Sequence, residues 1–317
     1  MFLRILKIAG AVLGVLVVIA AAGFFYLSEP DVPRDELIAK YGQSPSAFVT
    51  LPSGAVAHYR DQGRAEGAPL LLLHGSNASL HTWEPWAKIL GDQFRIISVD
   101  LPGHGLTGRV PGDDYSQLGM TRFVSQFATA IGLSRFAIGG NSMGGGIAAR
   151  FAIMFPERVT RLVLVDAGGV PWPASSSPPF IFRLARTPVV RDVMLHVTPR
   201  FVFEENLRGA FGKDEMIDEA MIDRYFELAR MPGSREATLI RLNTPGDPYV
   251  GDHLDEIRAP TLILWGRDDT WTPLSMGEIF KAGIARSEML VFDGVGHITM
   301  EEVPVESAAA VRAFLGR

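Results

Sequence analysis

The chain has 317 residues, of which 47% are hydrophobic and 21% charged, a composition that excludes a disordered protein and supports one large globular domain. Its formal net charge is −5 and it has no long basic tract, so we expect no nucleic-acid partner. The absence of cysteine excludes disulfides and a thiol nucleophile, and the histidines lack metal-binding spacing, so we expect neither a metal nor another cofactor.

The first element is an apolar segment, residues 8–27, which covers twenty positions without a charge. As a helix it rises about 30 Å, the thickness of the hydrocarbon core of a bilayer, so we expect it to cross a membrane. Arg4 and Lys7 precede this segment, whereas Glu29 and Asp31 follow it. This charge order predicts a single-pass anchor in the inner membrane, with the N-terminus in the cytoplasm and the following domain in the periplasm.

Residues 1–27 are therefore expected to form an uncleaved membrane anchor. Residues 28–44, which contain Pro30 and Pro33, are expected to form a linker. The alternative is a signal peptide that is cleaved near the three alanines at 20–22, which predicts a secreted enzyme. The apolar run continues beyond those alanines, and this favours the anchor.

A predicted buried strand at residues 69–73 leads into His74-Gly75-Ser76-Asn77. A loop that follows an early strand supplies a backbone N–H group to an active site in folds with a serine nucleophile. We expect the amide of Ser76 to be one donor to an oxyanion, with Asn77 as the alternative. The other interpretation of this loop is a plain glycine turn, because main-chain donors leave little signature in side chains.

The sequence Gly140-Asn141-Ser142-Met143-Gly144 follows an apolar, strand-like segment at 135–139 and precedes a helical one. A G-x-S-x-G run in this context predicts a nucleophile elbow, a sharp turn that exposes the serine hydroxyl. Ser142 is therefore the candidate nucleophile. The amide of Met143, at the start of the helix, is the second candidate oxyanion donor. An ordinary strand-to-helix turn with a solvated serine is the alternative.

Residues 171–255 form a long insertion that opens with prolines and serines and continues with helical patterns, for example at 217–231. We expect a helical cap over the carboxyl ends of the strands. Trp172 and Trp271 flank the expected mouth of the site and, with Asn77, are candidate substrate-binding residues. The alternative for any one cap residue is packing in the cap's own core. Apolar side chains expected to shape an acyl or alcohol pocket are Phe180, Phe182, Met194, Phe201, Phe203 and Tyr225.

Two further predicted strands lead into loops with a carboxylate and an imidazole. The strand at 261–265 ends in a turn-rich loop with Asp268 and Asp269, of which Asp269 is the candidate acid and Asp268 the alternative. The strand at 289–292 leads directly into the loop that holds His297. A serine hydroxyl needs a histidine to take its proton and a carboxylate to orient that histidine. The order of serine, acid and histidine along the chain therefore predicts a catalytic triad.

These motifs together resemble the α/β-hydrolase superfamily over residues 45 to the end of the chain. The resemblance implies a mainly parallel, eight-stranded sheet with helices on both faces, and it places the acid at Asp269. The implied core comprises residues 45–170 and 256–317, with residues 171–255 as the cap. The motifs are His74-Gly75, Asp100-x-Pro102-Gly103-x-Gly105, the Ser142 elbow, Gly266-x-x-Asp269 and Gly296-His297.

Locally, residues 140–145, 166–169 and 265–269 look like the meta-cleavage product hydrolases, which cleave carbon–carbon bonds. The chain departs from their pattern at residues 76–79 and at Ile298. The segments Ala78-Ser79-Leu80-His81-Thr82-Trp83 and Leu101-Pro102-Gly103-His104-Gly105-Leu106-Thr107-Gly108 look more like bacterial esterases and lipases.

We therefore predict a serine hydrolase of the carboxylesterase and lipase type that acts on a small, apolar ester. The first alternative is a carbon–carbon bond hydrolase, which is expected to use cap arginines such as Arg183 or Arg186. The remote alternative is a ligand-binding member of the fold without catalysis.

Overall fold

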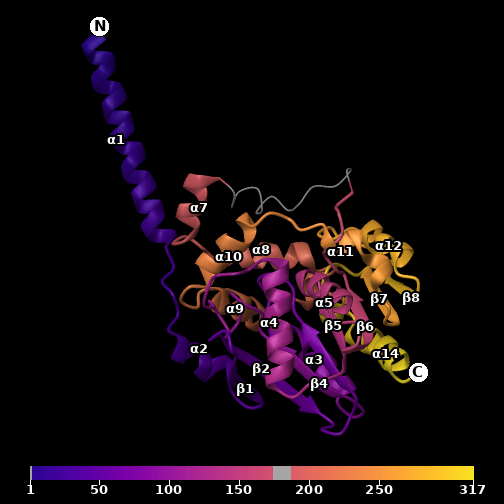
Figure 1. Ribbon diagram of the computed structural model, residues 1–317. Helices are drawn as coiled ribbons and strands as arrows, with labels where there is room; N and C mark the ends of the chain where they lie inside the picture. The colour runs from indigo at the N-terminus through magenta and orange to yellow at the C-terminus, as the bar shows by residue number, and fades with distance from the viewer. Residues whose placement is uncertain (1, 174–186) are drawn as a thin grey trace.

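The computed structural model describes residues 2–173 and 187–317 (Figure 1). A central sheet with helices on both faces forms the body, and one long helix projects from it. Four residues that the sequence analysis assigns to the substrate site lie outside the described residues, namely Phe180, Phe182, Arg183 and Arg186.

The sheet has eight strands in the order β1-β2-β4-β3-β5-β6-β7-β8. β1 pairs antiparallel with β2, and β2 pairs antiparallel with β4. All later neighbours are parallel, which confirms the predicted mainly parallel sheet. The strands are β1 (Ser46–Thr50), β2 (Val56–Gly63), β3 (Pro69–Leu73), β4 (Arg95–Val99), β5 (Phe136–Asn141), β6 (Val159–Val165), β7 (Thr261–Gly266) and β8 (Ser287–Phe292).

The central strands are apolar on both faces because helices cover both faces. Along β3, Leu70 and Leu72 belong to one buried cluster, whereas Leu71 and Leu73 belong to the other. This follows from the period of two residues along a strand. The first cluster packs under α3 (Glu84–Leu90) and α14 (Pro304–Leu315). The second packs under α4 (Gln117–Ala130), α5 (Met143–Met154) and α12 (Leu274–Gly283). The short helices η1 (Leu80–Trp83) and α13 (Thr299–Glu302) complete the body.

The segment between β6 and β7 is helical where the structure describes it. In Figure 1, its helices α7, α8 and α10 lie at the end of the body from which α1 projects. The predicted helix at 217–231 is α9 (Glu219–Ala229), which begins after Asp218, whose carboxylate accepts the amide of Met221 at 2.7 Å. The other elements are α7 (Pro188–Met194), α8 (Arg200–Ala210), η2 (Asp214–Met216), α10 (Ser234–Asn243), α11 (Tyr249–Asp252) and η3 (Leu254–Glu256).

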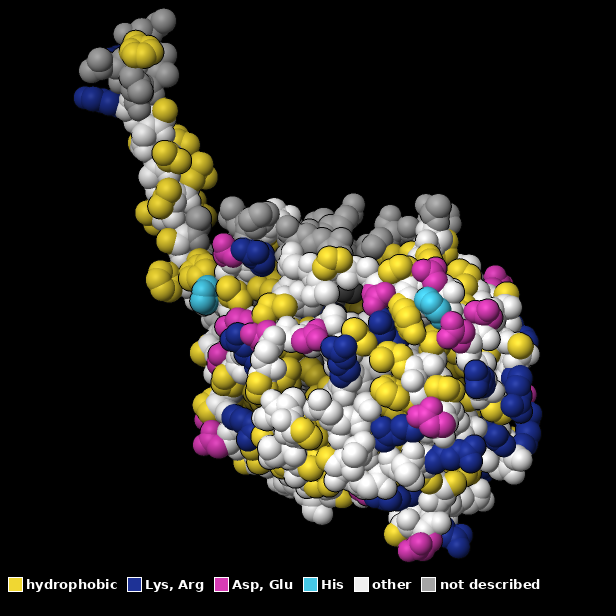
Figure 2. All heavy atoms as spheres, viewed as in Figure 1, with side chains coloured by type: hydrophobic (Ala, Val, Ile, Leu, Met, Phe, Trp, Pro, Cys, Tyr) yellow, Lys and Arg dark blue, Asp and Glu magenta, His cyan; other side chains and the backbone are white. Residues whose placement is uncertain are grey.

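The N-terminal helix α1 (Phe2–Leu27) stands away from the body. Its segment Lys7–Leu27 has a mean hydropathy of 2.6 and is unburied, so its length and composition suffice to cross a membrane. Figure 2 shows hydrophobic side chains along this helix. The finding fits both an anchor and a signal sequence, because each needs a long apolar helix.

The segment expected to be a plain linker is ordered and attached to the insertion. Within residues 28–44, helix α2 (Arg34–Tyr41) buries Leu37 to 1% exposure against Leu228 and Met231. The chain just before α2 donates backbone hydrogen bonds to the insertion, from Glu29 to His196 at 3.1 Å and from Val32 to Arg230 at 2.9 Å. The apolar residue in α2 and these main-chain bonds explain why the segment is fixed.

Candidate active site

Ser142 occupies the turn between β5 and α5. Its backbone has φ 52° and ψ −120°, a conformation that costs energy for a side chain with a Cβ atom. The flanking glycines are required by close approach. A Cβ on Gly140 would lie 2.3 Å from the backbone of Gly144, and one on Gly144 would lie 2.2 Å from the carbonyl oxygen of Leu73. The G-x-S-x-G spacing is therefore what lets α5 leave the strand so tightly.

His297 and Asp269 form a buried pair. His297 Nδ1 lies 2.8 Å from Asp269 Oδ2, and this hydrogen bond leaves Nε2 as the free ring nitrogen. The other carboxylate oxygen of Asp269 accepts the amides of Trp271 and Thr272, at 2.7 and 2.9 Å. The neighbouring Asp268 is exposed. The structure therefore brings Asp269, and not Asp268, to the histidine.

Electrostatics at this pair favour a charged imidazole. Burial lowers the pKa of His297, but the nearby Asp269 carboxylate outweighs it and raises that pKa above its ordinary value. A second buried carboxyl, Asp166, lies close by and accepts the amide of Gly266 and the hydroxyl of Thr299, both at 2.7 Å. Burial and the charge of Asp269 raise the pKa of Asp166 well above its usual range. The raised pKa favours the neutral form of Asp166 and so reduces the negative charge beside His297.

Ser142 and His297 line one small cavity of about 60 Å³. The insertion contributes Phe203 and Tyr225 to its wall, as predicted for these two side chains. Among the described residues, Ser142 Oγ makes no hydrogen bond, so the hydroxyl is free to rotate toward the imidazole or a substrate. Trp271 also lines the cavity and stacks on the ring of His297 with centroids 5.4 Å apart.

The predicted oxyanion donors lie on two adjoining cavities. Ser76 and the alternative Asn77 line the small cavity, and Asn77 has a positive φ of 58°. Met143 lines a wider cavity of about 520 Å³. Within the described chain, the amides of Ser76 and Met143 donate to no protein acceptor. The Ser76 hydroxyl accepts a hydrogen bond from Arg241 Nη2 at 2.7 Å. Two unsatisfied amides beside a serine hydroxyl can receive a negatively charged oxygen.

Some predicted pocket residues lie elsewhere. Trp172 packs against the buried cluster under α4, α5 and α12. It lines neither the small cavity nor the adjoining cavity of about 520 Å³. Met194 packs against Leu239 and Leu242 of α10, and Phe201 is 58% exposed. The prediction that Met194 and Phe201 shape the pocket is therefore wrong, because helical patterning does not tell which face of a short helix meets the site.

Sequence reasoning missed side chains that hold the catalytic loops. Asn141 Nδ2 donates to the carbonyl oxygen of His297 at 3.0 Å. The hydroxyl of Thr272 donates to Asp269 Oδ2 at 2.6 Å. The carboxylate of Glu302 accepts the amide of Gly296 at 2.8 Å. Asn141 precedes Ser142 and Thr272 lies three residues after Asp269, but the sequence gives no signal of the contacts they make. In the part of the chain that is described, no cluster of three metal-binding side chains occurs.

Comparison with known proteins gives a family and two kinds of relative. A family model described as alpha/beta hydrolase fold matches residues 68–304. A 2-hydroxy-6-oxononadienedioate/2-hydroxy-6-oxononatrienedioate hydrolase of Paraburkholderia phymatum is 30% identical over 287 residues, covering 86% of this chain and 96% of that protein. Monoacylglycerol lipase abhd6-A of Xenopus laevis is 27% identical over 270 residues, covering 81% of this chain and 78% of that protein. A solved structure of a membrane phospholipase A, described as a bacterial virulence factor, has a TM-score of 0.72 and 27% identity, covering 97% of this chain and 98% of that one.

Proposed function

The chain belongs to the α/β-hydrolase fold family, and from this premise we propose that it is a serine hydrolase that cleaves carboxylic esters through an acyl-enzyme. The observation that carries the proposal is that His297, joined to Asp269 at 2.8 Å, lines the same cavity as Ser142. A nucleophile, a base and an orienting acid are the three groups that this chemistry needs.

In the first half of the reaction, Ser142 Oγ attacks the ester carbonyl carbon while His297 Nε2 takes the hydroxyl proton. The carbonyl oxygen becomes negative and is held by the amides of Met143 and Ser76. Asp269 stabilises the imidazolium that forms at His297. The intermediate collapses when the alcohol leaves with the proton from Nε2, and the acyl group stays on Ser142.

In the second half, water replaces the alcohol. His297 takes a proton from water, and the oxygen attacks the acyl carbon, again with the negative oxygen at the two amides. Collapse returns the proton to Ser142 Oγ and releases the carboxylic acid. Trp271, stacked on His297, and Phe203 line the cavity, and their apolar surfaces disfavour water beside the reacting groups.

Two measurements on the full-length protein in detergent test this function. A fluorophosphonate probe is expected to label the chain at Ser142, and a panel of p-nitrophenyl esters is expected to be hydrolysed. An unlabelled Ser142 in folded protein would support the ligand-binding alternative. Full-length protein is the right material because the segment after α1 is hydrogen-bonded to the insertion.

Carbon–carbon bond cleavage is the second candidate, and the relative that is 30% identical favours it, since it is named a hydrolase of this kind of dienoate. The same serine, histidine and aspartate serve that reaction. A competition between p-nitrophenyl butyrate and a 2-hydroxy-6-oxo-dienoate separates the two. A kcat/KM that is at least about tenfold higher for the dienoate would replace the esterase assignment.

We also propose that residues 1–27 form an uncleaved anchor and that residues 8–27 span the inner membrane with the hydrolase in the periplasm. Residues 45–170 and 256–317 then form the core, with residues 171–255 as the cap. The likeness to a membrane phospholipase A extends over 97% of this chain and supports the anchor.

The chain has no cysteine, so a single introduced thiol reports the topology. The exposed Ser53→Cys variant is expected to react with an impermeant maleimide in spheroplasts with intact inner membranes. Labelling only after lysis would place the enzyme in the cytoplasm. The mass of the mature protein decides between the anchor and the secreted alternative.

A further inference from the structure

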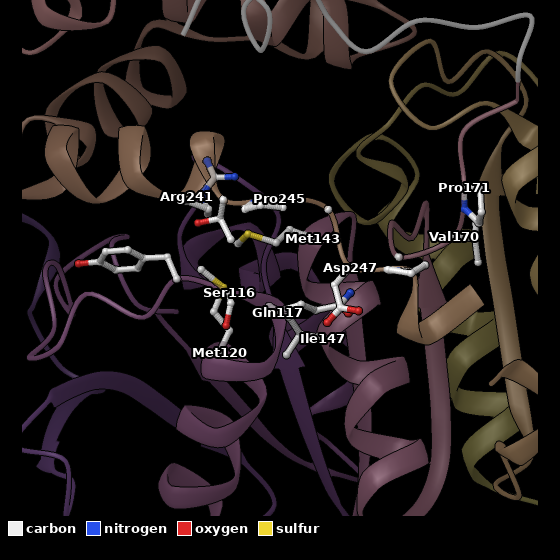
Figure 3. Close-up of a pocket in the computed structure, with 15 residues that line it drawn as sticks. Ser116, Gln117, Met120, Met143, Ile147, Val170, Pro171, Arg241, Pro245 and Asp247 are labelled. Atoms are coloured by element: carbon white, nitrogen blue, oxygen red, sulfur yellow. The ribbon is translucent and has the colours of Figure 1, made fainter. Parts of the chain in front are cut away.

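A second, wider cavity lies beside the catalytic one. It encloses about 520 Å³ and is lined by the start of α4, by Met143 and Ile147 of α5, and by α10 with the loop after it. Figure 3 shows Arg241 and Met143 on one side of this cavity and Val170 and Pro171 on the other. Met143 directly follows Ser142, so the two cavities adjoin at the nucleophile elbow.

Arg241 stands at the boundary between the two cavities. Its Nη2 donates to the hydroxyl of Ser76 at 2.7 Å and lies 3.5 Å from Asn77 Oδ1. Ser76 and Asn77 line the catalytic cavity, whereas Arg241 lines the wide one. The guanidinium is thus one side chain away from the proposed oxyanion site and open to the larger space.

No described residue supplies a counter-charge to Arg241, whose polar partners are the side chains of Ser76 and Asn77. Burial alone lowers the pKa of Arg241 to about 10, so the side chain remains a cation at neutral pH. Among the described residues it forms no ion pair, and the segment 174–186 contains neither Asp nor Glu. Asp247, the one carboxylate that lines the same cavity, is paired with Arg150.

Arg235, on the same helix as Arg241, has a carboxylate partner, which Arg241 lacks in the described chain. Arg235 of α10 is buried, and it lies 3.7 Å from the carboxylate of Asp31 and donates to the carbonyl oxygen of Glu29 at 2.6 Å. Arg241 is partly buried and has only neutral partners among the described residues, the side chains of Ser76 and Asn77. The Nε of each arginine is buried with no acceptor in the described chain, so the carboxylate is what distinguishes them. A guanidinium has five N–H donors, so most of those of Arg241 are unused. A partly buried cation without an anion is unfavourable by itself.

We propose that Arg241 binds an anionic oxygen group of the substrate, a carboxylate or a phosphate, which lies in the wide cavity while the ester carbonyl lies at Ser142. The inference rests on the proposed ester hydrolysis and adds a substrate class to it. The apolar part of the ester fills the small cavity among Phe203, Leu207 and Trp271. The anion completes the charge pairing that the protein leaves open, in the bidentate geometry that guanidinium favours.

The test compares pairs of esters that differ by one anionic group. Mono-p-nitrophenyl glutarate is paired with its methyl ester, which places a carboxylate in the acyl half. A 1-acylglycerol 3-phosphate is paired with the 1-acylglycerol of the same chain length, which places a phosphate in the alcohol half. The protein is full-length wild type in detergent, with Arg241→Gln, Arg241→Lys and Ser76→Ala variants. The control is Arg122→Gln, which removes an exposed arginine on α4 and changes the net charge equally.

Wild type is expected to prefer the anionic member of at least one pair by about tenfold or more in kcat/KM. Arg241→Gln is expected to lower that ratio roughly 10- to 100-fold, mainly through KM, while the neutral member changes little. Arg241→Lys, which keeps a charge without the fork, is expected to retain part of the preference, and Arg122→Gln all of it. The pair that responds identifies the anion.

Equal losses for both members of a pair in Arg241→Gln would overturn the proposal, because they would mean that Arg241 only positions Ser76. The Ser76→Ala variant keeps Arg241 and removes only the hydroxyl that it contacts, so it is expected to retain the ratio between the two members. Hydrolysis of all esters by wild type without any anionic preference would overturn the inference and leave the ester hydrolase standing. Failure of wild type to hydrolyse any ester would remove the proposed function and this inference with it.

Discussion

The catalytic floor and the helical insertion are built by different physical means. The floor, which consists of Ser142, Asp269, His297 and their loops, is held by hydrogen bonds between polar side chains and the main chain and by glycines that admit no side chain. The insertion, helices α7 to α11, is held by side-chain contacts and by the segment that follows the N-terminal helix. The difference suggests that the floor determines the reaction and the insertion determines which substrate reaches it.

Sheet topology explains the precision of the floor. The elbow, the acid loop and the histidine loop follow β5, β7 and β8. Because these strands are parallel, the three loops lie at the same edge of the sheet, at the carboxyl ends of the strands. Loops at the carboxyl ends of parallel strands meet there regardless of their distance along the chain. The described part of the insertion contains no strand that would orient its helices, so small changes of packing can alter the pocket without disturbing the reaction centre.

The largest expected effect comes from the nucleophile. Ser142→Ala is expected to lower kcat for ester hydrolysis at least about 10³-fold without changing the unfolding temperature, because the hydroxyl makes no hydrogen bond in the described structure. Turnover and thermal unfolding are measured on the same preparation. Ser53→Ala, at an exposed turn, is the control and should match wild type. A Ser142→Ala variant that keeps more than a tenth of the activity would show that Ser142 is not the nucleophile and that the reaction occurs elsewhere.

The next largest effect is expected from substitution of the acid, Asp269. Asp269→Asn is expected to lower kcat roughly 10²- to 10³-fold, because an amide at this position leaves the imidazole in the wrong tautomer and removes the charge that supports it. Asp268→Asn is the matched control, since Asp268 is adjacent but exposed and does not contact His297. Equal losses in the two variants would show that the loop, and not one carboxylate, carries the effect.

The sequence predicted most of the floor and little of the insertion. The strand predicted at 69–73 is β3, with the same ends, and the one predicted at 261–265 differs from β7 by one residue. Runs of buried β-branched and leucine residues between turn signals are informative because tertiary packing agrees with local preference there. The order of the G-x-S-x-G, aspartate and histidine motifs then indicated which loops meet.

The contacts between loops and the lining of the pocket required coordinates. Asn141 lies inside a predicted motif, yet its side chain bonds to His297, 156 positions along the chain. Arg241 is one arginine in an ordinary helical pattern, and only its place beside Ser76 makes it unusual. Phe203 and Phe201 differ by two positions in one helix, but only Phe203 lines the cavity. Such distinctions depend on helix orientation, which a single sequence does not encode locally.

A pH profile sharpens the comparison at the floor. Asp269 raises the pKa of His297 despite burial, and only the neutral imidazole can take the serine proton. We therefore expect kcat/KM to fall about tenfold per pH unit below a midpoint that lies above the ordinary histidine pKa of about 6.5. Asp268→Asn is expected to keep this midpoint. A midpoint below the ordinary value would mean that burial, rather than the carboxylate, governs the histidine.

The smallest expected effect tests how the insertion is held. Glu29 Oε2 lies 2.6 Å from Arg230 Nη1, and both side chains are partly exposed, so the pair is worth about 0.5–1 kcal/mol. Glu29→Gln is expected to lower the unfolding temperature of the full-length protein by about 2 °C, because the amide oxygen still accepts a hydrogen bond. Glu36→Gln, at an exposed position of α2, removes the same charge without an ion pair in the described structure and should leave the unfolding temperature unchanged.

If Glu29→Gln also lowers the kcat/KM of all esters, the N-terminal segment holds the insertion in its catalytic position, and the separation between floor and insertion does not hold. If only the unfolding temperature changes, the attachment adds stability while the floor alone determines the reaction.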